Sequence, residues 1–239
     1  MSSSLPHMHL HPHGHQEAHF EQTEFIRDIV IGMADGLTVP FALAAGLSSA
    51  VSNNDIIVTA GIAEICAGAI AMGLGGYLAG RTEIEHYDSE LKREYMEVEH
   101  HYEREKEEVR EVFAAYGLSH ELQVQIADEI AKDEKKWVDF MMRFELGLEK
   151  PDEKRARKSA FNIGVAYIVG GIIPLAGYIA TDNPHKGLLI SSGITVCCLF
   201  AFGYYKSKMT GQQPIMGAIK TTGIGLLAAG AAYFIASLF

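Results

Sequence analysis

Carboxylates occur inside two long apolar stretches of the sequence, where ionisable residues are rare. Asp35 lies in the first stretch, and the second contains both Glu64 and Met72. A carboxylate in a membrane interior is costly, so it usually faces a cavity or a partner and marks a functional position. Oxygen ligands alone suit Mg²⁺, Ca²⁺ or Mn²⁺, whereas an added thioether shifts the preference toward later transition metals. These residues therefore indicate a path or site for a divalent transition ion.

Two more acids precede Asp35 on the same predicted helix. At about 100° per residue, Asp28 and Asp35 point within about 20° of each other, and Glu24 lies one turn behind Asp28. These three residues would form a ladder of carboxylates that enters the bilayer, with Glu24 and Asp28 at the mouth of the path. In the second stretch Gly68 lies between Glu64 and Met72, which leaves room for another helix to approach. The alternative is structural: a protonated carboxyl hydrogen-bonded to a neighbouring helix.

A second set of acids lies in a charged segment. Two Glu-x-x-Glu pairs, Glu94/Glu97 and Glu105/Glu108, begin eleven residues apart. Eleven residues is close to three turns, so on one continuous helix all four carboxylates share a narrow stripe. The pairs would then lie about 16 Å apart along the axis, too far to share one ion. We therefore expect two separate metal sites, each completed by ligands from another helix.

The best candidates for those further ligands are Met141, Met142 and Glu145. Met141 and Glu145 share one face of a predicted helix, because residues four apart are neighbours on a helix surface. The alternative is a solvated charged face, in which nearby lysines and arginines pair with the glutamates.

Other functions fit part of the same pattern. Glu97 and His100 form Glu-x-x-His, a motif that di-iron carboxylate bundles use in two copies. A membrane-attached di-iron ferroxidase is therefore the alternative function. A metal sensor that transports nothing is a third reading.

The composition separates an apolar part from a charged part. Of 239 residues with a net charge of −10, the stretch 81–158 contains 15 of the 20 Lys and Arg and 22 of the 30 Asp and Glu. The remainder is apolar and glycine-rich, a composition typical of membrane proteins. Five stretches reach the roughly 20 residues that cross a hydrocarbon core: 25–50, 56–80, 160–181, 187–206 and 214–238.

The predicted fold is an all-α integral membrane protein with a three-helix domain between its second and third membrane helices. We expect a disordered tail at 1–22, membrane helices at 23–80, the acidic domain at 81–152 and further membrane helices at 153–239. Inside the acidic domain, Arg81–Tyr116 contains no Pro or Gly and predicts one long helix. A second helix begins after Ser119, and a third spans 133–148.

The tail contains six histidines, which indicate weak metal binding or no essential role: His7, His9, His11, His13, His15 and His19. The distribution of Lys and Arg predicts that the N-terminus and the acidic domain are cytosolic and that the C-terminus lies on the opposite side. We expect no nucleic-acid partner.

Two longer motifs contain the carboxylates of the apolar stretches. The first is the run from Asp35 through Gly36-Leu37-Thr38-Val39-Pro40 to Phe41. The second extends from Glu64 through Ala71-Met72-Gly73-Leu74-Gly75-Gly76 to Ala79. Both motifs resemble those of the vacuolar iron transporter family, and they occur in adjacent spans, in the family's order, with the charged insert directly after them. The resemblance covers essentially the whole chain, and the long insert is similar to that of the plant branch.

The resemblance implies a homodimer in the vacuolar membrane, with five membrane helices per subunit and the ion path at the subunit interface. It implies exchange of cytosolic Fe²⁺ for vacuolar protons, with no obligatory cofactor. Zn²⁺, Co²⁺ or Mn²⁺ are possible further ions. By position, Asp35, Glu64 and Met72 match the family's path. The acidic-domain residues match its cytosolic metal site: Glu94, Glu97, Glu105, Glu108, Met141, Met142 and Glu145.

Overall fold

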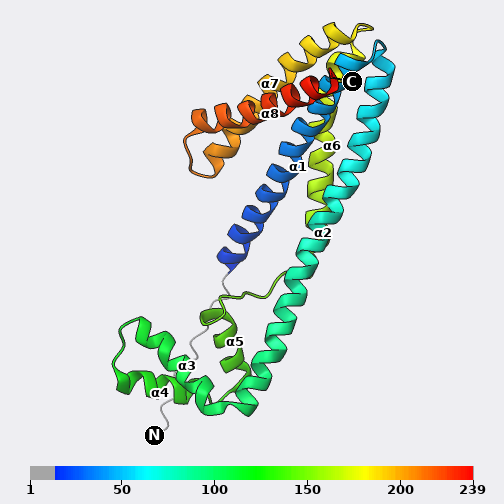
Figure 1. Ribbon diagram of the computed structural model, residues 1–239. Coiled ribbons are helices and arrows are strands. Elements are labelled where there is room, and N and C mark those ends of the chain that lie inside the picture. Colours follow the sequence, from blue (N-terminus) through cyan, green and yellow to red (C-terminus); the bar gives the residue numbers. More distant parts are fainter. Residues whose placement is uncertain (1–13, 239) are drawn as a thin grey trace. The chain divides into compact units, whose positions relative to one another are not determined.

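The computed structural model describes residues 14–238, with side chains from Glu24 onward, and this part of the chain is helical without strands (Figure 1). Its helices are α1 (Gly14–Ala50), α2 (Asn54–His100), α3 (Tyr102–Ala115), α4 (His120–Ile130), α5 (Glu134–Phe144), α6 (Arg155–Ile179), α7 (Pro184–Met209) and α8 (Pro214–Ala236). Residues 1–13 of the predicted tail lie outside the described residues. Residues 14–22, which we assigned to that disordered tail, belong to α1.

Five of these helices are long and apolar enough to cross a membrane, as the sequence predicts. They are α1 from Glu24 onward, α2, α6, α7 and α8. The 47 residues of α2 would extend about 70 Å, more than twice a hydrocarbon core of about 30 Å. Because its residues from Arg81 onward are mostly charged or polar, only the apolar first part of α2 suits the membrane.

The chain forms two compact units. One contains the residues up to Gly76 together with those from Lys158 onward, and the other contains Tyr77–Arg157. The charged unit is therefore slightly longer than the predicted 81–152, because it also contains residues 77–80 and 153–157.

The apolar unit is held together by close helix–helix contacts at small residues. In this unit α1 packs against α7 and α8, which also pack against each other. At Gly36 of α1, an added Cβ would lie 3.0 Å from the Cα of Tyr167 on α6. Small residues of this kind let helix backbones approach closely in lipid. α6 accordingly lies beside α1 (Figure 1).

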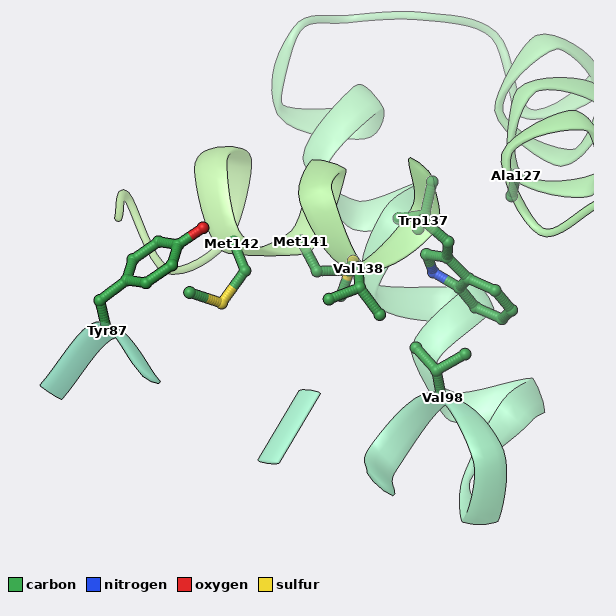
Figure 2. Close-up of a cluster of buried hydrophobic side chains, with 8 residues drawn as sticks. Tyr87, Val98, Ala127, Trp137, Val138, Met141 and Met142 are labelled. Atoms are coloured by element: carbon green, nitrogen blue, oxygen red, sulfur yellow. The ribbon is translucent and has the colours of Figure 1, made fainter. Parts of the chain in front are cut away.

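The charged unit has its own hydrophobic core (Figure 2). Trp137 and Val138 of α5 are almost completely buried against Val98 from the end of α2 and Val109 from α3. The ring of Tyr102 meets Trp137 edge-on, with ring centroids 5.1 Å apart. The core therefore joins residues from both sides of the α2–α3 junction.

The single long helix predicted over 81–116 is wrong, because the chain breaks at His101. His101 has φ −125° and ψ 33°, which ends α2 at His100 and starts α3 at Tyr102 in a new direction (Figure 1). The unit thus contains the end of α2 and three further helices, rather than three helices. α3 ends at Ala115, and Gly117 just beyond it has a φ of +79°. Ser119 is the N-cap of α4, as expected. The third predicted helix is shorter than 133–148 and ends at Phe144.

Candidate functional site

The break at His101 brings together carboxylates that a straight helix would keep apart. Glu94 of α2, Glu105 of α3 and Glu145 at the end of α5 place ligand oxygens within 4.8 Å of one another. Among the described residues this is the one such group of three acids, histidines or cysteines. The prediction of two separate sites about 16 Å apart is therefore wrong for Glu94 and Glu105, which belong to one cluster.

Burial raises the free-energy cost of ionising the carboxyl groups of this cluster. Glu94 and Glu105 are 1% and 2% exposed. Burial, and then the charges of Glu105 and Glu145, raise the pKa of Glu94 to about 8. Burial, and then the charge of Glu108, raise the pKa of Glu105 to about 7. Glu145 is exposed overall, and its pKa is raised by partial desolvation and then by the charges of Glu108 and Glu97.

The cluster also leaves hydrogen-bonding capacity unused. Oε1 of Glu94 and Oε2 of Glu105 are buried and have no hydrogen-bond partner among the described residues. Buried polar atoms without partners are uncommon and call for an explanation, of which ion binding is one. Three neighbouring carboxylates, two of which have a buried oxygen without a partner among the described residues, suit a divalent cation, whose charge would offset their mutual repulsion. The donor set therefore fits a metal ion.

Glu97 and Glu108, the second members of the two pairs, contact arginines on their own helices. Arg93 Nε lies 3.5 Å from Glu97, and Arg104 Nε lies 3.0 Å from Glu108. The charges of both glutamates nevertheless act on Glu105 and Glu145. They therefore add negative charge around the cluster, although each also pairs with an arginine.

The two predicted thioether ligands lie in the hydrophobic core. Met141 is completely buried and Met142 is 1% exposed. Figure 2 shows both side chains directed into this core, Met142 toward Tyr87 and Met141 beside Val138. Glu145 follows Met141 by one helical turn and does reach the carboxylate cluster. The structure thus joins Glu145 to the glutamates and gives the methionines a packing role in this conformation.

The Glu-x-x-His motif does not contribute a histidine to the cluster. The Nδ1 atom of His100 lies 2.8 Å from the carbonyl oxygen of Met96 on its own helix, and the side chain is exposed. A di-iron centre would need such histidines directed inward with the glutamates.

In the apolar unit, Asp28 of α1 is buried against α6. Ser159 Oγ donates a hydrogen bond to Asp28 Oδ1 at 3.0 Å, and Asn162 Nδ2 donates to Oδ2 at 3.5 Å. Asp28 is 1% exposed. Hydrogen bonds of this kind stabilise a carboxylate that burial would otherwise penalise. Asp28 is therefore held by α6, away from the exposed face of α1.

Glu64 of α2 is also held by α6. The hydroxyl of Tyr167 donates a hydrogen bond to Glu64 Oε1. Glu64 Oε2 is buried and has no hydrogen-bond partner among the described residues. The phenol ring lies over Gly68, where an added Cβ would be 2.5 Å from Tyr167 Cζ. The close approach predicted at Gly68 is therefore present, and Tyr167 fills it.

The other predicted path residues lie nearby on α1 and α2 without forming a ligand cluster within one chain. Asp35, Met72 and Glu24 are half-buried. Among the described residues, the carboxylates of the apolar unit therefore form no group of three close ligands.

Three polar residues of α6 escaped the sequence-based prediction: Ser159, Asn162 and Tyr167. All lie in or next to the third apolar stretch, where a serine, an asparagine and a tyrosine resemble ordinary membrane-helix composition. The feature that could have identified them is that each side chain can donate a hydrogen bond, which a carboxylate inside a membrane needs.

Known proteins resemble this chain over most of its length. A model of the VIT family matches residues 26–237. The chain is 50% identical over 224 residues to "Vacuolar iron transporter 1" of Arabidopsis thaliana, covering 94% of this chain and 90% of that protein. It is 47% identical over 221 residues to "Vacuolar iron transporter 1" of Oryza sativa subsp. japonica, covering 92% and 88%.

A more distant relative extends the comparison to yeast. "Protein CCC1" of Saccharomyces cerevisiae is 36% identical over 221 residues, which cover 89% of this chain and 68% of that protein. The family expected from the two motifs is thus confirmed by the match across the apolar and charged units alike, and this protein is a member of the VIT family.

Proposed function

We propose that this protein transports Fe²⁺ from the cytosol into the vacuole in exchange for protons. The observation that carries the proposal is Glu64, a carboxylate on an apolar helix with one buried oxygen that has no partner among the described residues. Its relatives named as vacuolar iron transporters, with 47–50% identity, support iron as the ion and the vacuole as the compartment. Zn²⁺, Co²⁺ and Mn²⁺ suit the same ligand types.

The proposed path starts at the charged unit. Glu94, Glu105 and Glu145 collect the ion in the cytosol, with Glu97 and Glu108 adding negative charge around them. The ion then passes Glu24 and Asp28 and reaches Asp35, Glu64 and Met72. The placement of Lys and Arg supports a cytosolic N-terminus and charged unit and a lumenal C-terminus.

Protons enter the cycle because they compete with the metal for carboxylates. A carboxylate must lose its proton to bind a cation, so metal binding releases protons. An acidic lumen would protonate Asp35 and Glu64 and release the ion there. The protons then leave on the cytosolic side, where the carboxylates can bind the next ion.

We further propose that two chains form the path together. The membrane carboxylates of one chain form no group of three close ligands among the described residues. A second copy would supply ligands from the opposite side, as expected for a path at a homodimer interface.

Asp35→Asn tests the path most simply, because it removes a charge and retains the size of the side chain. In proteoliposomes we expect the variant to lose Fe²⁺ uptake while keeping the elution volume of the wild type. Asp182→Asn, which removes an exposed carboxylate between α6 and α7, is the matched control and should transport normally. Proton-driven uptake retained by Asp35→Asn would contradict the assignment.

Measurements on the same proteoliposomes distinguish a transporter from a ferroxidase or a metal sensor. A ferroxidase would consume oxygen when Fe²⁺ is added, and a sensor would bind metal without moving it. The antiporter accumulates Fe²⁺ without oxygen consumption.

A further inference from the structure

Tyr167 is held in place by two helices at once. It lies on α6 and is 2% exposed. Its backbone packs against Gly36 of α1, and its ring packs against Gly68 of α2. A side chain at either glycine would overlap Tyr167, so the two glycines set the position of the phenol. Its hydroxyl therefore has little freedom to leave Glu64.

We propose that Tyr167 is a positioning residue that orients the Glu64 carboxylate toward the transported ion. This inference rests on the proposed function, since it takes Glu64 as an ion ligand. The Tyr167 hydroxyl donates a hydrogen bond to Oε1 of Glu64, whereas Oε2 has no hydrogen-bond partner among the described residues. One oxygen is thus fixed by the protein, and the other is left for the ion. Carboxylates that bind metals are commonly held by hydrogen bonds in this way.

The chemistry of a phenol suits this position. A carboxylate in an apolar helix needs a donor to remain ionised, and Lys or Arg would supply one. Those residues would also place a positive charge beside a divalent cation and repel it. Tyrosine is neutral and donates a single hydrogen bond. Tyr167 therefore stabilises ionised Glu64 without opposing the ion.

Tyr167→Phe removes the hydroxyl and keeps the ring over Gly68. Tyr178→Phe is the matched control on the same helix: Tyr178 is equally buried, but its hydroxyl donates to the backbone carbonyl of Ala44 at 3.2 Å. The measurement is Fe²⁺ uptake into proteoliposomes over a range of concentrations, giving KM and maximal rate separately. Loss of a hydrogen bond to a charged group predicts a KM at least about tenfold higher in Tyr167→Phe. We expect Tyr178→Phe to keep the wild-type KM.

A second pair of variants tests the same bond without changing Tyr167. Gly68→Ala pushes the phenol away from Glu64 and should also raise KM. Gly193→Ala is its control, because a Cβ there would meet no described atom within 4 Å. If Tyr167→Phe does not fold, Gly68→Ala decides the question.

The outcomes separate this inference from the proposed function. Wild-type protein without Fe²⁺ uptake would refute the transporter itself. An active wild type with an unchanged KM in Tyr167→Phe would refute only the role of Tyr167. Equal losses in Tyr167→Phe and Tyr178→Phe would also refute it, because they would indicate general packing.

Discussion

The carboxylates of Glu94 and Glu105 lie within 4.8 Å of each other, although eleven residues of an unbroken helix would place them about 16 Å apart. The break at His101 accounts for the difference, since Glu94 precedes it on α2 and Glu105 follows it on α3. Their shared burial raises both pKa values, so the metal-free protein keeps protons that a cation can displace.

Removing one charge from this cluster should weaken metal binding and relieve repulsion. Glu105→Gln is expected to lower the affinity for Fe²⁺ or Zn²⁺ at least about tenfold, because even outer-shell partners of a metal contribute that much. Glu111→Gln, an exposed charge on the same helix, is the control and should bind normally. Isothermal titration of the full chain in detergent measures both, and equal affinities would favour a merely solvated acidic face.

The metal-free charged unit should lose stability as pH rises. Because the folded-state pKa values of Glu94 and Glu105 are raised to about 8 and about 7, the folded state holds more protons than the unfolded state above the ordinary glutamate pKa. Stability then falls as pH rises through this window. Trp137, the single tryptophan of the chain and part of this core, reports unfolding by fluorescence.

With EDTA present, we expect the melting temperature to fall steadily between pH 5.5 and 8.5. Glu105→Gln should flatten that slope, since it removes one of the titrating groups. A melting temperature that stays constant or rises over this range would show that the cluster is not buried as described.

The hydrogen bond from Ser159 to Asp28 should matter for transport as well as for folding. Ser159→Ala removes a buried donor from a carboxylate and should lower stability by about 1–3 kcal/mol. Ser191→Ala is the matched control: its buried hydroxyl donates to the carbonyl of Pro174 at 2.6 Å and reaches no carboxylate. Thermal melts in detergent should show losses in both, whereas Fe²⁺ uptake should fall only in Ser159→Ala.

The membrane helices could be predicted from sequence because their length and apolarity are local properties. The break at His101 could not, since neither Gly nor Pro marks it. Its cause is tertiary: Val98 and Val109 enter one core, and Tyr102 packs on Trp137. The eleven-residue spacing therefore predicted separate positions for Glu94 and Glu105, whereas the structure places both in one cluster.

Tyr167 was missed for a related reason. A tyrosine in an apolar helix is most often a packing residue, and its role depends on which side chain faces it. The sequence alone does not show that Tyr167 of α6 packs against both Gly36 and Gly68. Sequence therefore predicted the carboxylates of the path but not the donors that hold them.

Coupled movement of Fe²⁺ and protons is the central claim, and one vesicle experiment tests it directly. Proteoliposomes containing the wild-type protein are prepared with an acidic or a neutral interior, and Fe²⁺ uptake and internal pH are recorded together. We predict that the acidic interior accelerates uptake and that the interior becomes more alkaline as Fe²⁺ enters. Uptake at the same rate without the gradient, with no change in internal pH, would contradict the account.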